Sequence, residues 1–158
     1  MQKIVTFLTY DNQAEDAVNL YTSVFPNARI TSTRRYGEAG PGDPGTVMTM
    51  SFELAGQEFI ALNGGPSFSF CQGISLFVNC ETQEEVDELS EKLTADGGHE
   101  DACGWLTDKF GVSWQIIPTQ LGELLGDPDP EKAGRVMEAM LKMRKIEIAE
   151  LEAAYEGR

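Results

Sequence analysis

The sequence has few of the residues from which metal centres and disulfide frameworks are built. Its 158 residues include one histidine, His99, and three cysteines, Cys71, Cys80 and Cys103. An odd number of widely spaced cysteines does not resemble a disulfide framework, and free thiols are typical of reducing compartments. We therefore expect a cytoplasmic protein with free thiols. A single histidine also excludes metal sites that need several imidazoles.

The sequence also has no long apolar run and few basic residues. No run of about 18 apolar residues occurs, so the sequence predicts no membrane-spanning helix. Met1-Gln2-Lys3 leads directly into an alternating pattern, so we expect no signal peptide. Lysine and arginine number 12 against 26 aspartates and glutamates, a net charge of −14. A field of that sign repels phosphate backbones, and we expect no nucleic-acid partner.

What is present suits a folded α+β protein. Hydrophobic residues make up 41% of the chain, enough for a sizeable core. Ile4 to Tyr10 alternates as a strand does, and Asn12 with Glu15 has the spacing of a capping box for the helix that ends at Pro26. Three further strands are predicted, the last two joined by a tight turn at Ala55-Gly56: residues 29–36, 46–54 and 58–63.

The same order of elements recurs in the second half. Residues 74–80 form a predicted strand, Thr82 and Glu85 have capping-box spacing, and Gly97-Gly98 ends the helix that follows. Trp105-Leu106 and residues 112–117 are further predicted strands. The sequence thus predicts two βαβββ modules, at about 1–65 and 73–121. One such module cannot cover its own helix and both sheet faces, so the modules pack together or exchange with a second chain.

Residues 122–158 are predicted to be a connector and a long C-terminal helix. Asp127-Pro-Asp-Pro130 is a rigid break, and residues 131–155 carry an apolar stripe at helical spacing. A helix of that length measures about 37 Å. Packing against the rest of the chain and contact with a partner subunit both remain open for it.

Three sequence blocks together resemble a known family. They are NQAEDAVNLYTSVFPNA at 12–28, ISLFVNCETQEE at 74–85 and CGWLTDKFGVSWQIIP at 103–118. In this order, and with the repeated module, they are similar to the PhnB-like group of the vicinal oxygen chelate (glyoxalase/bleomycin resistance/dioxygenase) superfamily. The group is often labelled a 3-demethylubiquinone-9 3-methyltransferase domain. The resemblance covers residues 1 to about 121.

The resemblance implies a glyoxalase-like fold in which paired modules curl mixed sheets around a cavity. It also implies a homodimer, since members of the superfamily often dimerise. Enzymes of the superfamily hold a divalent metal with His, Glu or Gln from the first and last strand of each module. The corresponding positions here are Thr6, Ile60, Ser75 and Gln115. Only Gln115 is of a type that the metal-using members employ, so we expect a degenerate site without metal.

Methyl transfer finds no support in the residues themselves. No glycine-rich strand–turn–helix loop for a nucleotide-like cofactor is present, because Gly40 to Gly45 lies between two predicted strands. We expect no cofactor, and whether the protein is an enzyme stays open.

Five residues are our candidates for contact with a small-molecule ligand: Gln115, Ser75, Trp114, Thr6 and Trp105. A structural role in the sheet is the alternative for each of them. The weaker candidates are the Cys103 thiol, His99 and the carboxylate pair Glu53 and Glu58, and no catalytic residue is assigned. The function that fits best is a PhnB-like small-molecule-binding protein. The alternatives are a metal-dependent lyase, isomerase or dioxygenase of the same superfamily, and a dimeric interaction module that acts through the C-terminal helix.

Overall fold

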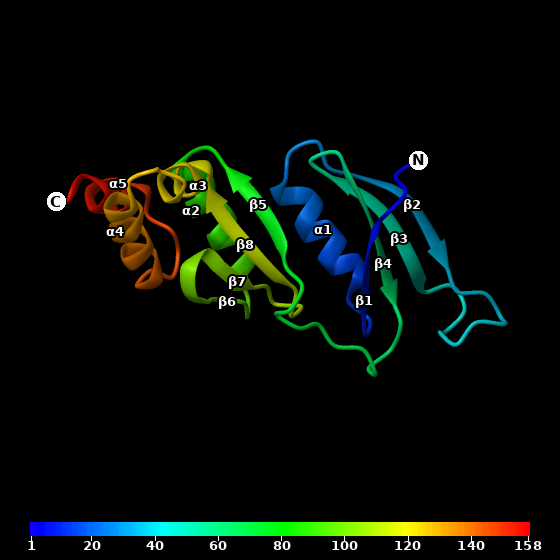
Figure 1. Cartoon of the computed structure of the whole chain (residues 1–158). Helices are drawn as coiled ribbons and strands as arrows, with labels where there is room; N and C mark the ends of the chain where they lie inside the picture. Colours follow the sequence, from blue (N-terminus) through cyan, green and yellow to red (C-terminus); the bar gives the residue numbers. More distant parts are fainter. The chain divides into compact units, whose positions relative to one another are not determined.

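A computed structural model describes all 158 residues of the chain. The chain divides into two compact units, Met1–Ser69 and Phe70–Arg158. Each unit is an α+β structure built on its own four-stranded mixed sheet (Figure 1). None of the helices has the length and apolar character that crossing a membrane requires.

The first unit has the predicted βαβββ order. Its sheet has the strand order β1-β4-β3-β2, in which only the β1–β4 pair is parallel. The hairpin between β3 and β4 turns at Ala55 and Gly56, both with positive φ, as the sequence predicts. The elements are β1 (Thr6–Tyr10), α1 (Ala14–Val24), β2 (Arg29–Arg35), β3 (Val47–Leu54) and β4 (Gln57–Asn63).

Helix α1 begins differently from the prediction. Its N-cap is Gln13 rather than Asn12, and no side-chain hydrogen bond caps the helix. The capping box predicted at Asn12 and Glu15 is therefore wrong. Instead the Ala14 N–H donates to Asn63 Oδ1 at 2.8 Å. A side chain at the end of β4 thus satisfies the helix end, and sequence spacing cannot reveal a partner 49 residues away.

The second unit repeats the order, with strands β5-β8-β7-β6 and a parallel β5–β8 pair. The Thr82 hydroxyl accepts from the Glu85 N–H at 3.2 Å, which confirms Thr82 as the cap of α2. The two-residue strand β6 and the one-turn helix η1 were not predicted. The elements are β5 (Leu76–Cys80), α2 (Gln83–Thr94), β6 (His99–Glu100), η1 (Ala102–Gly104), β7 (Trp105–Thr107) and β8 (Ser113–Pro118).

The C-terminal helical region is present, but it is not one long helix. It consists of α3 (Thr119–Leu125), α4 (Pro130–Leu141) and α5 (Ile148–Glu156). Residues 142–147 leave the helical conformation, so the prediction of one helix over 131–155 is wrong. The side chains of Met143 and Ile146 in this break are buried in the same apolar cluster as Val136 and Leu151. Burial of these two side chains favours the break over a continuous helix.

Each sheet has one face covered by its own helix. In the first unit the buried side chains of α1 pack against the face of Met50 and Phe52. In the second unit α2 contacts β5, β6, β7 and β8 and covers the face of Trp114 and Ile116. Side chains of neighbouring residues on a strand point to opposite faces. The residues that alternate with these therefore form the opposite face of each sheet, which we call the open face.

Candidate ligand-binding face

The open face of the second unit is centred on Gln115 of β8. The Gln115 Nε2 donates to the Ser75 Oγ at 2.8 Å, which joins two of the predicted site residues from positions 40 residues apart in sequence. Both side chains are half-buried. The Gln115 Oε1 and the Ser75 hydroxyl hydrogen have no partner within the chain. The pair therefore presents one acceptor and one donor side by side.

Two aromatic side chains flank this pair. Strand β8 lies between β5 and β7, and the Cα partners of Gln115 on those strands are Phe77 and Trp105. Directly paired residues share a sheet face, so Phe77, Gln115 and Trp105 form one row across three strands. Phe77 has 54% of its surface exposed, and Trp105 is half-buried.

Trp114 lies on the opposite face, contrary to our prediction that it contacts the ligand together with Gln115. Its side chain is only 2% exposed, and its indole N–H donates to the buried Asp108 carboxylate at 2.9 Å. Because successive strand residues alternate, Trp114 cannot share the face of Gln115. Trp114 is a core residue of the second unit.

Thr6 belongs to the first unit, on the face of β1 that also carries the buried Leu8 and Tyr10. The neighbouring residue, Phe7, is 51% exposed and is the Cα partner of Ile60. Phe7 and Ile60 therefore lie on the open face of the first sheet, and Thr6 does not. We placed the open-face position of β1 at Thr6, one residue before Phe7. A shift of one residue moves a strand side chain to the other face of the sheet.

The register gives the two units corresponding open-face positions. Phe7 pairs with Ile60 on the parallel strands β1 and β4, and Phe77 pairs with Gln115 on β5 and β8. Of these four residues only Gln115 carries a donor atom for a divalent metal. Nor does the chain contain a group of three or more His, Cys, Asp or Glu side chains placed to hold a metal ion. The residues at these positions do not fit the metal that the superfamily's enzymes hold.

A cavity of about 440 Å³ adjoins Trp105 at the edge of this face. It is lined by Gln72, Asp101, Ala102, Cys103 and Trp105. Asp101 is held in place because its carboxylate accepts from the Thr107 hydroxyl at 2.9 Å and lies 3.0 Å from His99 Nδ1. His99 is thus a half-exposed neighbour of Asp101 on β6, outside any cluster of metal ligands.

The remaining sequence candidates have structural explanations. Glu53 and Glu58 are directly paired across the β3–β4 hairpin, but Arg29 binds Glu53 at 2.9 Å. The hydrogen bond from Arg29 lowers the pKa of the Glu53 carboxyl and keeps it ionised, which disfavours a role as general acid. Cys80 is buried, and its loss of solvation raises the pKa of its thiol to about 12. The Cys80 thiol is therefore not a nucleophile.

Comparison with known proteins gives the family. The sequence profile of the family described as 3-demethylubiquinone-9 3-methyltransferase matches residues 2–117. A solved structure described as a putative 3-demethylubiquinone-9 3-methyltransferase, PhnB protein, from Bacillus cereus is 43% identical, with a TM-score of 0.68. The alignment covers 74% of this chain and 99% of that one. No curated protein matches the chain significantly.

More distant solved structures share the fold. Protein PA1353 from Pseudomonas aeruginosa is 20% identical over 75% of this chain and 98% of that chain, with a TM-score of 0.62. The fosfomycin resistance protein FosX from Listeria monocytogenes, solved with Mn(II) and sulfate, is 18% identical over 72% of this chain and 90% of that chain, with a TM-score of 0.52. The chain therefore belongs to the PhnB-like, 3-demethylubiquinone-9 3-methyltransferase family.

Proposed function

We propose that this protein binds an uncharged, flat small molecule on the open face of its second unit, without a metal ion. The observation that carries the proposal is the row formed by Phe77, Gln115 and Trp105, with Ser75 bonded to Gln115. Ligand sites combine apolar and aromatic walls with a few placed polar groups, and this row has that composition.

The polar pair suggests which ligand groups fit. The Ser75 hydroxyl can donate to a ligand carbonyl, while Gln115 Oε1 can accept from a hydroxyl or amide N–H. Aromatic side chains on either side favour a ring, which stacks on or packs edge-on to such groups. An aromatic compound with a carbonyl next to its ring satisfies both requirements.

The charge of the protein bears on the ligand as well. At −14 the chain repels anions at long range. No lysine or arginine is paired with Gln115 or Ser75 to offset that repulsion. A neutral ligand is therefore favoured over a carboxylate or phosphate.

The metal site of the superfamily is proposed to be degenerate in this chain. Support comes from the open-face residues Phe7, Ile60 and Phe77, which offer no ligand atom. The hydroxyl of Ser75, one of the positions inferred from the resemblance, already accepts a hydrogen bond from Gln115. The Mn(II) in the Listeria FosX structure belongs to a protein only 18% identical, which shares the fold alone. Metal analysis of the purified protein tests this part, and one tightly held divalent ion per chain would contradict it.

Thermal unfolding with a compound panel tests ligand binding. Acetophenone, coumarin and 1-phenyl-1,2-propanedione cover aromatic carbonyl and dicarbonyl chemistry. A ligand at ten times its Kd stabilises the protein by about 1.4 kcal/mol, which raises the Tm by a few degrees. The Gln115→Ala variant should lose this shift, whereas Gln57→Ala, an exposed glutamine of the first unit, should keep it. If no compound shifts the wild-type Tm, or if Gln115→Ala keeps the shift, the proposal fails.

We further propose that the protein is a homodimer. Both sheets carry a half-exposed phenylalanine on their open faces, and such apolar surface is most stable when covered. Sedimentation equilibrium should give twice the chain mass of 17.4 kDa. A monomer at concentrations of about 100 µM, well above a typical dimer Kd, contradicts this expectation.

A further inference from the structure

The segment between α4 and α5, residues 142–147, is here called the strap. It lies beyond residue 117, where the match to the family ends. Two of its side chains, Met143 and Ile146, are buried against Val136, Leu151 and Ile117. The strap is thus fixed to the end of β8, the strand that carries Gln115.

The strap also binds the backbone of η1. The Cys103 N–H donates to the Met143 carbonyl at 2.9 Å, and the Gly104 N–H donates to the Arg144 carbonyl at 2.7 Å. The Arg144 guanidinium reaches back to the Glu100 carbonyl at 2.8 Å. Three hydrogen bonds therefore connect the strap to the segment directly before Trp105.

The conformation of η1 needs such support. Cys103 has a φ of 60°, in the left-handed region that residues other than glycine rarely adopt, and Gly104 follows with a φ of 84°. The Trp105 N–H donates to the Ala102 carbonyl, and the Asp101 N–H donates to the Trp105 carbonyl. The conformation of η1 therefore determines the position of the Trp105 backbone.

The same turn lines the cavity that adjoins Trp105 of the candidate site. Ala102, Cys103 and Trp105 line the cavity of about 440 Å³, while the backbone N–H groups of Cys103 and Gly104 bind the strap. One turn therefore contacts both the cavity and the strap. A displacement of the strap would move a wall of the cavity.

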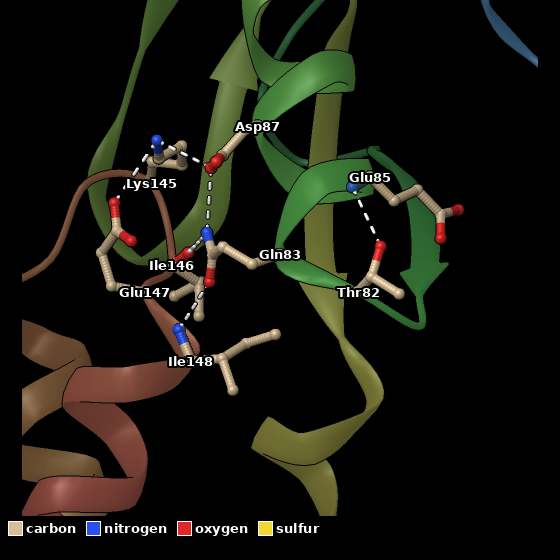
Figure 2. A network of polar contacts seen from close by, with 8 residues as sticks. All are labelled: Thr82, Gln83, Glu85, Asp87, Lys145, Ile146, Glu147 and Ile148. Carbon is tan, nitrogen blue, oxygen red and sulfur yellow. Dashed lines mark hydrogen bonds and ion pairs between the residues drawn. The ribbon is translucent and has the colours of Figure 1, made fainter.

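Gln83 of α2 anchors the strap from the other end. Its Nε2 donates to the Ile146 carbonyl at 3.0 Å and to Asp87 Oδ1 at 2.9 Å, and its Oε1 accepts from the Ile148 N–H at 2.7 Å (Figure 2). Lys145 adds an ion pair to Asp87 at 2.8 Å. None of these residues belongs to the candidate site.

We infer that the strap positions the candidate site: it holds η1 in its left-handed turn and thereby holds Trp105 beside Gln115. This role rests on the proposed function insofar as it concerns ligand affinity. Trp105 is then a ligand-contacting residue, and Gln83 is a positioning residue that acts through the strap.

Gln83→Ala is the direct test, because it removes the hydrogen bonds to the Ile146 carbonyl of the strap and to the Ile148 N–H directly after it, and no atom of the site. The Trp105 indole N–H resonance should shift in the ligand-free protein, while the Trp114 resonance, held by Asp108, stays in place. Amide hydrogen exchange at Cys103 and Gly104 should become about tenfold faster. The Kd for 1-phenyl-1,2-propanedione should rise about tenfold.

The matched control is Gln120→Ala, since the Gln120 side chain donates to the Glu81 carbonyl and accepts from the Thr119 hydroxyl, both away from the strap. Arg144→Ala is a second test variant, which removes only the bond to Glu100. An unchanged Trp105 resonance and unchanged exchange in both test variants overturn the inference. A shifted Trp105 resonance together with an unchanged Kd for the compound that the wild type binds also overturns the inference. If the wild type binds no compound, the proposed function fails, and a shifted Trp105 in Gln83→Ala still supports the positioning of that residue by the strap.

Discussion

Asp108 shows how a single buried residue organises the strand pair that carries the candidate site. It is 2% exposed, and its carboxylate accepts from the Phe110 N–H, the Val112 N–H and the Trp114 indole N–H at 2.9 to 3.0 Å. These bonds shape the turn between β7 and β8 and fix Trp114 on the covered face. The position of Gln115 on the open face follows, since it is the next residue.

Asp108→Ala should therefore destabilise the protein severely. It leaves three donors without their partner, and the free energy of unfolding should fall by at least about 3 kcal/mol. Asp108→Asn keeps an oxygen for the two backbone donors but turns an N–H group toward Trp114, so its loss should be intermediate. Urea unfolding measures both. Asp43→Ala, in an exposed loop, should change stability by less than about 0.5 kcal/mol. Comparable losses for Asp108 and Asp43 would disprove the role of this carboxylate.

The three thiols should react at very different rates. Cys71 is exposed, Cys103 is half-buried and Cys80 is buried. Desolvation raises the pKa of the Cys80 thiol to about 12, so at pH 8 it holds almost no thiolate. With a chromogenic disulfide reagent we expect Cys71 to react first and Cys80 only after denaturation. Cys71→Ser should abolish the fast phase, whereas Cys80→Ser should leave the native reaction unchanged. A fast reaction at Cys80 would show that its burial is incomplete.

At the residue scale, the sequence predicts the strands of the site better than their faces. Gln115 and Ser75 were identified from the sequence, and the structure joins them by a hydrogen bond. Trp114 lies on the strand of Gln115 but on its covered face, and Thr6 lies on the covered face of β1 in the first unit. Both faces of these strands carry apolar residues, so alternation alone does not show which face a helix covers. The packing of α1 and α2 decides this, and it depends on contacts distant in sequence.

At the scale of elements, the two βαβββ modules were predictable because their strands alternate and their turns carry glycine. The break in the C-terminal helix was not. Residues 142–147 contain no proline or glycine, and several of them are good helix formers. Backbone donors of Cys103 and Gly104, together with Gln83, bind the strap from outside and replace the helical hydrogen bonds. Tertiary contacts of this kind override local propensity.

Gly104 tests how tightly η1, β8 and the strap are packed. A Cβ at this position would lie 2.7 Å from Ile117 Cδ1 and 2.9 Å from Ile146 Cγ1, and its φ is 84°. Gly104→Ala should therefore combine overpacking with backbone strain and cost about 2 to 4 kcal/mol. Gly45 has a similar φ of 87° with no atom within 4 Å, so Gly45→Ala should show the strain alone, about 1 kcal/mol. Equal losses of unfolding free energy for the two variants would mean that the strap moves to accommodate the added methyl group at little cost.

At the scale of the whole molecule, the charge is unevenly distributed. Residues 70–158 hold 19 of the 26 acidic residues and eight of the 12 basic ones. Helix α2 is an example, with five acidic residues and only Lys92 as a basic residue. The few ion pairs are mostly at exposed side chains, where each contributes little. Repulsion among like charges is therefore a net cost of folding the second unit.

Salt should accordingly stabilise the protein. The Debye length falls from about 30 Å at 0.01 M to about 8 Å at 0.15 M ionic strength, which screens repulsion between distant carboxylates. We expect the Tm to rise by several degrees over this range, and a similar rise in sodium and potassium chloride would identify screening as the cause. Replacing exposed acidic residues of α2, as in Glu84→Gln with Glu91→Gln, should raise the Tm at low salt and reduce its dependence on salt. A Tm that falls as salt is added would mean that attractive pairs, such as Lys145 with Asp87, outweigh the repulsion.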